Sequence, residues 1–216
     1  MTVAPAAVAS ATPARIREIA ALTREAGTWN TPTMYLWENL YGDPDVDAVL
    51  NQPEMQYVSP RQRNGWRNQA QNRQRFSSDV ISAHNQLRKD ILKALSDAGA
   101  GLLMGTDSPQ MFNVPGFALH REIRVMAEAG LSNYQVLQSG TVNVARYAST
   151  ELGRSGNFGT VAVGNRADLV LLSANPLDDL DNLTGRVGVM VKGHWISAQE
   201  IETGLAALAA KYAGQE

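Results

Sequence analysis

Residues 101–109 read Gly-Leu-Leu-Met-Gly-Thr-Asp-Ser-Pro, and this stretch decides how the sequence is interpreted. The apolar run from Leu102 to Met104 is short and follows a glycine, which is typical of a buried strand. Polar residues then follow at the carboxyl end of that strand, where enzymes built from alternating strands and helices collect their catalytic groups. Asp107 lies at this position, and a carboxylate there can bind a metal ion and accept a proton from bound water. The alternative is that Asp107 only caps a turn.

Helices and one further strand are predicted before this stretch. Apolar residues spaced by three and four predict a long helix over 76–98, ended by Gly99. An earlier helix begins at Thr12-Pro13 and ends at Gly27, because these residue types cap the two ends of helices. Between them, residues 28–34 predict a short strand that Pro32 weakens. The side chains of the first helix that we expect to face inward are Ile16, Ile19, Ala20 and Leu22.

More helices are predicted after residue 109, over 117–129, 133–139 and 142–152. Ser132 with Gln135 forms a capping box that opens the second of these helices. Strands therefore alternate with helices up to about residue 155, which is the pattern of βα units around a parallel sheet. Two βα units cannot close a barrel, so this chain is expected to be part of a larger fold.

The segment 35–75 is expected to be irregular, because Gly42, Pro44, Pro53 and Pro60 interrupt it. Such long connections are usually functional lids or disordered. Its end, residues 61–75, carries five arginines, no acidic residue and Trp66. This basic stretch could bind an anion or a nucleic acid strand, and the alternative is a solvated helix face.

From residue 159 the apolar pattern changes to a period of two, which predicts antiparallel strands over 160–163, 169–172, 187–191 and 195–196. A last helix begins at Ser197, which Glu200 pairs with as a capping box. The sequence therefore predicts two domains, 1–155 and 156–216. The predicted fold class is α/β.

Composition excludes several classes of protein. Hydrophobic residues make up 44% and charged residues 19%, which excludes disorder over most of the 216 residues. The net charge of −2 argues against a dedicated nucleic-acid binder. The absence of cysteine excludes disulfides and thiolate metal sites. No apolar run is long enough for a membrane span, and residues 1–13 do not have the pattern of a targeting signal.

The histidines give no local metal-binding signature, because no two of them are spaced as metal ligands on one helix or strand. His84 lies on the apolar face of the helix 76–98 and is expected to be a packed core residue. His120 begins a helix soon after the Asp107 loop, so it could face the same pocket. His194 is expected to be exposed in a hairpin turn.

The order of several short motifs resembles the metal-dependent amidohydrolase superfamily, in its imidazolonepropionase-like and prolidase-like branch. The resemblance runs from about residue 13 to 196, and the joint order of the motifs is far more specific than any one of them. The motifs are AGTWNTPT (26–33), GTDS (105–108), HRE (120–122), AGLS (129–132), TVNVA (141–145), GTV (159–161), ADLV (167–170), NPL (175–177) and VMVKG (189–193).

The resemblance implies a partial (β/α)8 TIM barrel, of which this chain has the last two βα units, beside the C-terminal strands of a small β-sandwich. It implies one or two divalent metals, with zinc expected. Asp107 matches the aspartate at the end of strand eight, which binds metal and acts as general base for hydrolytic water. Tyr35, Asn113 and His120 match substrate-facing loops. The histidines and the lysine that complete the family's site would lie upstream of this chain, so the chain alone is expected to hold metal poorly.

Two functions therefore remain open from the sequence. The first is a metal-dependent hydrolase of carbon–nitrogen bonds in a small cyclic amide or dipeptide-like substrate. The second is a non-catalytic binding or assembly module left from a truncated amidohydrolase. The expected partners are a small-molecule substrate and either a second copy of the chain or a missing N-terminal half, with no nucleic acid and no membrane.

Overall fold

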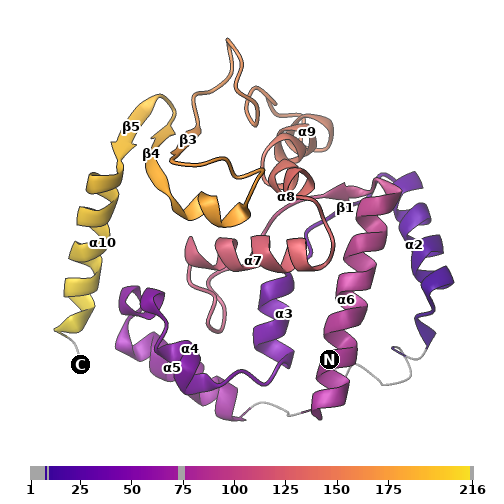
Figure 1. Ribbon diagram of the computed structural model, residues 1–216, viewed down its shortest axis with the longest axis horizontal. Helices are drawn as coiled ribbons and strands as arrows, with labels where there is room; N and C mark the ends of the chain where they lie inside the picture. Colours follow the sequence, from indigo (N-terminus) through magenta and orange to yellow (C-terminus); the bar gives the residue numbers. More distant parts are fainter. Residues whose placement is uncertain (1–7, 9, 73–75, 215–216) are drawn as a thin grey trace.

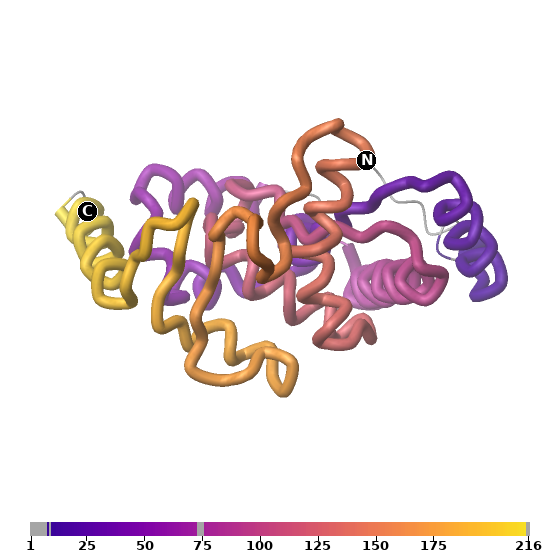
Figure 2. Tube along the Cα trace, turned by 90° about the horizontal axis from the view of Figure 1, so that it is seen from above, coloured from indigo at the N-terminus to yellow at the C-terminus, as the bar shows by residue number. Residues whose placement is uncertain are grey.

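The computed structural model describes residues 8, 10–72 and 76–214, and it is a mixed α/β structure in which helices surround two small sheets. The molecule is elongated, with the N-terminal helix α2 (Pro13–Glu25) at one end and the C-terminal helix α10 (Ala198–Ala213) at the other, as Figures 1 and 2 show. None of the helices in the described part of the chain is long and apolar enough to cross a membrane.

The first sheet is parallel and consists of β1 (Trp29–Asn30) and β2 (Gly101–Leu102), with Trp29 opposite Gly101. Both strands are shorter than the sequence predicts. Pro32 has no N–H to donate, and Thr33 adopts a left-handed conformation (φ 46°) from which the next helix starts, so the ladder ends at Asn30.

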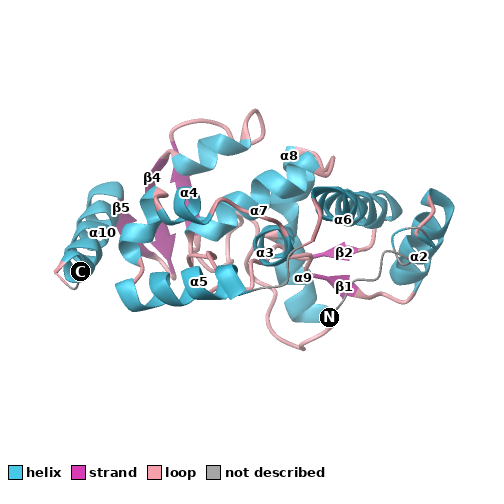
Figure 3. Ribbon diagram, turned by 90° about the horizontal axis from the view of Figure 1, so that it is seen from below, coloured by secondary structure: helices cyan, strands magenta, loops and turns pink. Residues whose placement is uncertain are grey.

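Helix α2 packs along α6 (Ser78–Ala98), and Figure 3 shows both helices beside the parallel sheet. The predicted cap is confirmed, because the Thr12 side chain accepts a hydrogen bond from the Arg15 N–H. Ala20 is buried, but Ile19 and Leu22 are 48% and 54% exposed, so the predicted inward face is wrong for them. Only the stripe of α2 that meets α6 is covered.

The expectation that residues 35–75 are irregular is wrong. This segment forms α3 (Met34–Tyr41), α4 (Val46–Leu50), the 3-10 helix η1 (Pro53–Tyr57) and α5 (Pro60–Asn72). Pro53 and Pro60 begin η1 and α5, because proline is well tolerated in the first turn, whereas Gly42 follows the end of α3. Helix α4 begins after Asp45, whose carboxylate accepts hydrogen bonds from the N–H groups of Asp47 and Ala48.

The basic stretch at 61–75 is largely the helix α5. The Trp66 side chain is only 3% exposed and packs edge-on against Phe112, with 5.9 Å between ring centroids, so the ring belongs to a core. Because a buried ring cannot stack on a nucleic acid base, this burial favours a solvated helix face over a nucleic-acid binding site. Residues 73–75, which carry two of the arginines, lie outside the described residues.

The central helices match their predicted positions closely. They are α7 (Phe117–Glu128), α8 (Asn133–Ser139) and α9 (Val142–Thr150), and the capping box of Ser132 and Gln135 is confirmed. His84 is 8% exposed, as expected of a core residue. The main core joins β2, α3, α6, α7 and α8, and its buried members are Met34, Leu92, Leu102, Ile123, Val125, Met126, Ala129, Leu131, Val136 and Leu180.

The C-terminal part forms a second, antiparallel sheet in the order β3 (Leu169–Leu172), β4 (Arg186–Val191) and β5 (His194–Ser197), with η2 (Leu180–Thr184) before β4. The predicted strand over 160–163 does not form, and Val161 and Val163 are exposed because no neighbouring strand pairs with them. The predicted capping box of Ser197 and Glu200 is confirmed at α10, which lies beside η1.

Glu122 on α7 fixes the start of α3. Its side chain is fully buried, and its two carboxylate oxygens accept hydrogen bonds from the backbone N–H groups of Met34 (2.9 Å) and Tyr35 (2.8 Å). Thr33, the cap residue of α3, makes no side-chain hydrogen bond of its own to the helix. Glu122 therefore supplies the missing cap from another element, and its negative charge suits the N-terminal end of the helix dipole.

We expect Glu122→Ala to lower the free energy of unfolding by about 2 to 4 kcal/mol, because two buried N–H groups lose their acceptor and a cavity forms. Chemical denaturation would measure the change. The matched control is Glu128→Ala on the same helix, whose exposed carboxylate pairs with Lys89 and whose loss should change the free energy by no more than about 1 kcal/mol. Equal effects of the two substitutions would contradict the role of Glu122.

The same residue predicts a pH dependence. Burial raises the pKa of Glu122 above its ordinary value of 4.5, although the N–H groups of Tyr35 and Met34 partly oppose the shift. Between that ordinary value and the raised pKa, the unfolded chain loses the proton while the folded chain retains it, so the contribution of Glu122 to stability decreases as pH rises through this range. The difference in unfolding free energy between wild type and Glu122→Gln should therefore fall as pH rises above about 4.5. A difference that rises over this range would contradict the raised pKa.

Candidate active site

Asp107 lies in the loop 105–109, which follows the carboxyl end of β2 as the sequence predicts. Its side chain is exposed, and its Oδ2 atom accepts a hydrogen bond of 3.2 Å from Gln110. The backbone of Asp107 is left-handed (φ 52°), a conformation that aspartate tolerates better than most residues. Thr106 and Ser108 on either side join their hydroxyl groups at 3.0 Å, so the loop has an internal hydrogen bond next to the carboxylate.

The loop comes close to the chain that leaves β1. A Cβ atom added at Gly105 would lie 2.5 Å from the side chain of Thr31, so only glycine allows this approach. The backbone N–H of Leu103 donates to the carbonyl of Asn30 at 2.8 Å and extends the strand pairing up to this point. The carboxyl ends of both strands thus meet at one place, with Asp107 beside them.

The side chain of Asn113 is hydrogen-bonded to the backbone of the Asp107 loop. This side chain is fully buried, and its Nδ2 atom donates to the carbonyl of Thr106 at 2.8 Å. Its Oδ1 atom accepts a hydrogen bond from Asn39 of α3 at 3.0 Å. The family resemblance implies a substrate-facing loop at Asn113, and the structure places its amide between Thr106 and Asn39.

Tyr35 is linked to the same network through Asn39. Burial raises the pKa of the Tyr35 hydroxyl, while its hydrogen bond with Asn39 and the charge of Arg121 partly lower it. The hydroxyl is therefore protonated at neutral pH, and the Arg121 guanidinium lies 5.8 Å from the ring centroid. A chain of side chains runs from Tyr35 through Asn39 and Asn113 to the backbone next to Asp107.

His120 lies on α7 with its Nε2 atom 3.4 Å from the Arg186 guanidinium of β4. Burial lowers the pKa of His120, and the neighbouring charges of Arg186 and Arg124 lower it further. The imidazole is therefore neutral at neutral pH and can accept a hydrogen bond from Arg186. The hydrogen bonds of the described residues thus link His120 to the C-terminal sheet, whereas Asn113 and Tyr35 are linked to the Asp107 loop.

An ion pair between Arg121 and Glu54, which the sequence did not indicate, lies next to Tyr35. Arg121 donates to the buried carboxylate of Glu54 at 2.7 Å and to the side chain of Gln52 at 3.0 Å. These partners are 67 and 69 residues from Arg121 in sequence, so no local spacing indicated them. The only available signal was the motif His-Arg-Glu at 120–122, of which Arg121 and Glu122 both make buried or half-buried contacts.

The described residues do not by themselves fit a complete metal site. Across residues 10–72 and 76–214, no group of three or more histidine or acidic side chains is placed so that it could hold a metal ion. Asp107 contributes one carboxylate, and tight divalent sites need three or four protein ligands. Any metal at Asp107 would need donors beyond those that this part of the chain supplies.

Comparisons with known proteins agree with the mixed α/β fold. The model of the amidohydrolase family matches residues 14–196. A bottromycin amidohydrolase structure is 25% identical, with a TM-score of 0.66 over 86% of this chain and 40% of that one. No match was found among curated protein sequences.

Two further solved structures share the fold. A Xaa-Pro dipeptidase with methionine bound in its active site is 20% identical, with a TM-score of 0.53 over 84% of this chain and 37% of that one. A prolidase complexed with N-methylphosphonate-L-proline is 23% identical, with a TM-score of 0.50 over 84% and 38%. This chain therefore spans about two fifths of the length of these structures. Because the family model covers most of its residues, the chain belongs to the amidohydrolase family and is related to its prolidase-like members.

Proposed function

We propose that this chain is the C-terminal part of a hydrolase that cleaves carbon–nitrogen bonds in a small cyclic amide or dipeptide-like substrate. The observation that carries the proposal is Asp107 at the joint carboxyl end of two parallel strands, in a chain of the amidohydrolase family. The prolidase-like relatives favour a dipeptide, since two of the similar structures are a Xaa-Pro dipeptidase and a prolidase. In this proposal β1 and β2 are the last two strands of a (β/α)8 barrel, and 156–216 contributes to a β-sandwich.

Asp107 is the proton acceptor for the attacking water in this proposal, and a ligand for a divalent metal. Its exposure leaves the carboxylate open to solvent and substrate, and Gln110 restrains only one of its oxygens. A general base must lie within hydrogen-bond reach of the proton that it removes, which an exposed carboxylate at the strand ends allows. Amidohydrolases generally use divalent metals, and we assign zinc.

Asn113 and Tyr35 have different parts in the proposal. Asn113 is a positioning residue, because its amide contacts the Thr106 carbonyl and not open space. Tyr35 is half-buried and protonated, so its hydroxyl can donate a hydrogen bond to a substrate carbonyl or carboxylate. His120 is assigned to substrate binding only by resemblance.

The remaining groups of the site come from outside the described residues, from an N-terminal half or from a second copy of the chain. The need for groups from outside the described residues also supports the second candidate function, a non-catalytic assembly module. Among the described residues, β1 and β2 pair only with each other, and two such short strands need further partners to be stable. Metal content separates the two candidates.

We expect the purified chain to hold well below one equivalent of zinc after metal loading and desalting, because a single carboxylate binds zinc weakly. Elemental mass spectrometry would measure the zinc. Adding the N-terminal half of a full-length relative should raise the content towards stoichiometry if the site is shared between the two parts. Zinc that stays low in that mixture would favour the assembly module, and tight zinc in the chain alone would mean that its own residues or a second copy complete the site.

Asp107→Asn should lower any metal-dependent hydrolysis of an Xaa-Pro dipeptide by about 10²- to 10⁴-fold, because the proton acceptor is lost. Asparagine also tolerates the left-handed backbone, so the fold should be unaffected. The control is Asp97→Asn on α6, which removes an exposed carboxylate paired with Lys93 and should leave the rate unchanged. An unchanged rate in Asp107→Asn would remove Asp107 from the reaction.

Asn113→Ala should destabilise the fold by about 1 to 3 kcal/mol and should loosen residues 105–109, because the Thr106 carbonyl loses its buried donor. The matched variant is Asn39→Ala, which breaks the contact between the two asparagines but keeps the hydrogen bond to Thr106. Amide hydrogen exchange at Thr106, Asp107 and Ser108 would then increase in Asn113→Ala and not in Asn39→Ala. Equal exchange in the two variants would show that Asn113 does not position the loop.

A further inference from the structure

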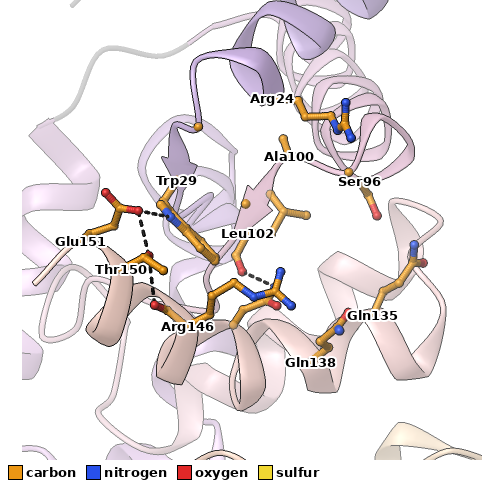
Figure 4. A pocket seen from close by; sticks show the side chains of 14 residues that line it. Arg24, Trp29, Ser96, Ala100, Leu102, Gln135, Gln138, Arg146, Thr150 and Glu151 are labelled. Atoms are coloured by element: carbon orange, nitrogen blue, oxygen red, sulfur yellow. Dashed lines mark hydrogen bonds between the residues drawn. The ribbon is translucent and has the colours of Figure 1, made fainter. Parts of the chain in front are cut away.

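A second concave site lies at the opposite end of the two parallel strands from Asp107. The amino ends of β1 and β2 border a hollow of about 500 Å³ between α2, α6, α8 and α9, shown in Figure 4. Gly27 and Gly99, both with positive φ, turn the chain into the two strands at its edge. The size suits a small molecule or ion.

Two arginines supply the charge of this hollow. Arg24 comes from the last turn of α2 and Arg146 from α9, 122 residues later, and Figure 4 shows both side chains at the hollow. Among the described residues, neither guanidinium has a hydrogen-bonded or ion-paired carboxylate partner. A Cβ added at Gly99 would lie 3.6 Å from Arg24 Nε, so Arg24 lies directly against the turn that leads into β2.

The one acidic residue of the hollow is already engaged. Glu151 accepts hydrogen bonds at the same oxygen from the Trp29 indole (3.3 Å) and the Thr150 hydroxyl (2.8 Å), at the edge of the hollow. The charged lining residues are therefore two arginines and one glutamate, with an excess of positive charge. Repulsion by Glu151 would weaken an anion bound beside it.

Neutral hydrogen-bond donors complete the lining. Ser96 of α6 and Gln138 of α8 both line the hollow, and among the described residues neither side chain is hydrogen-bonded to another group. Asn143 also lines it, but its Nδ2 atom is used by the Leu102 carbonyl at 2.9 Å. Guanidinium groups with hydroxyl and amide donors are the groups that hold carboxylate and phosphate oxygens in proteins.

We infer that this hollow is a binding site for a small oxyanion, a phosphate or carboxylate group held by Arg24 and Arg146. The site is separate from the proposed hydrolytic site, because the two lie at opposite ends of the same strand pair. It holds its ligand by charge and hydrogen bonds alone, and no covalent step is involved. The ring of Trp29 lies at its edge and reports on occupation of the site.

The test is a titration of the full chain with inorganic phosphate, and separately with acetate, followed by the NMR signal of the Trp29 indole N–H. Trp29→Phe assigns this signal among the four tryptophans. We expect a saturable shift at millimolar anion, and the anion that binds more tightly identifies the phosphate or carboxylate source. Arg24→Gln and Arg146→Gln should each weaken binding by about tenfold or more, because each removes a charge-assisted hydrogen bond.

Two further variants separate a site from general surface charge. Arg15→Gln removes an arginine from the same helix α2, where it pairs with Glu18 outside the hollow, and should leave binding unchanged. Glu151→Gln keeps an acceptor for Trp29 but removes the negative charge, and should tighten binding. The absence of a saturable shift with either anion would overturn the inference, and so would equal weakening by Arg15→Gln and Arg24→Gln. Because the readout is binding and not hydrolysis, failure of the proposed function would not affect it.

Discussion

The parallel pairing of β1 with β2 is the constraint on which the rest of this structure depends. It brings together two segments that are 72 residues apart in register, Trp29 opposite Gly101 and Asn30 opposite Leu102. The approach is close, because a Cβ at Gly101 would lie 2.6 Å from the Trp29 ring and a Cβ at Gly105 would lie 2.5 Å from Thr31. Glycine at both positions allows the two segments of the chain to approach this closely, and the Asp107 loop begins where their pairing ends.

Such a short pair of strands cannot hold its own geometry, so the surrounding helices must hold it. Leu102 lies in the main core with Met126 and Val136, and this burial fixes β2 against α7 and α8. Outside the strands, buried hydrogen bonds hold the neighbouring elements in place. Glu122 of α7 holds the start of α3, and Asn39 of α3 in turn contacts Asn113 behind the Asp107 loop. The candidate site therefore depends on α3 and α7 as much as on the strands.

Features that depend on neighbouring residues, such as helix caps, could be predicted from the sequence, whereas contacts between distant segments could not. The helix caps at Thr12, Ser132 and Ser197 could be predicted, because a cap and its partner lie within one turn of each other. The helices within 35–72 could not be predicted, because Pro53 and Pro60 can interrupt a helix and can equally begin one. The position of Asp107 after a buried strand could be predicted, because it follows a short apolar run in the sequence. The hydrogen bond between Asn39 and Asn113, which supports the Asp107 loop, could not be predicted, because the two residues are 74 positions apart and neither belongs to a recognisable motif.

The ends of the strand pair differ in chemistry for a reason that the backbone supplies. At the carboxyl ends the chain leaves the sheet through the loop 105–109, which exposes a carboxylate. At the amino ends it enters the sheet from the C-termini of α2 and α6, through Gly27 and Gly99. The C-terminus of a helix carries partial negative charge, which favours a cation such as Arg24 in the last turn of α2. Arg24, together with Arg146 from α9, brings positive charge to the amino ends, whereas the loop 105–109 brings a carboxylate to the carboxyl ends, so each end suits a different kind of ligand.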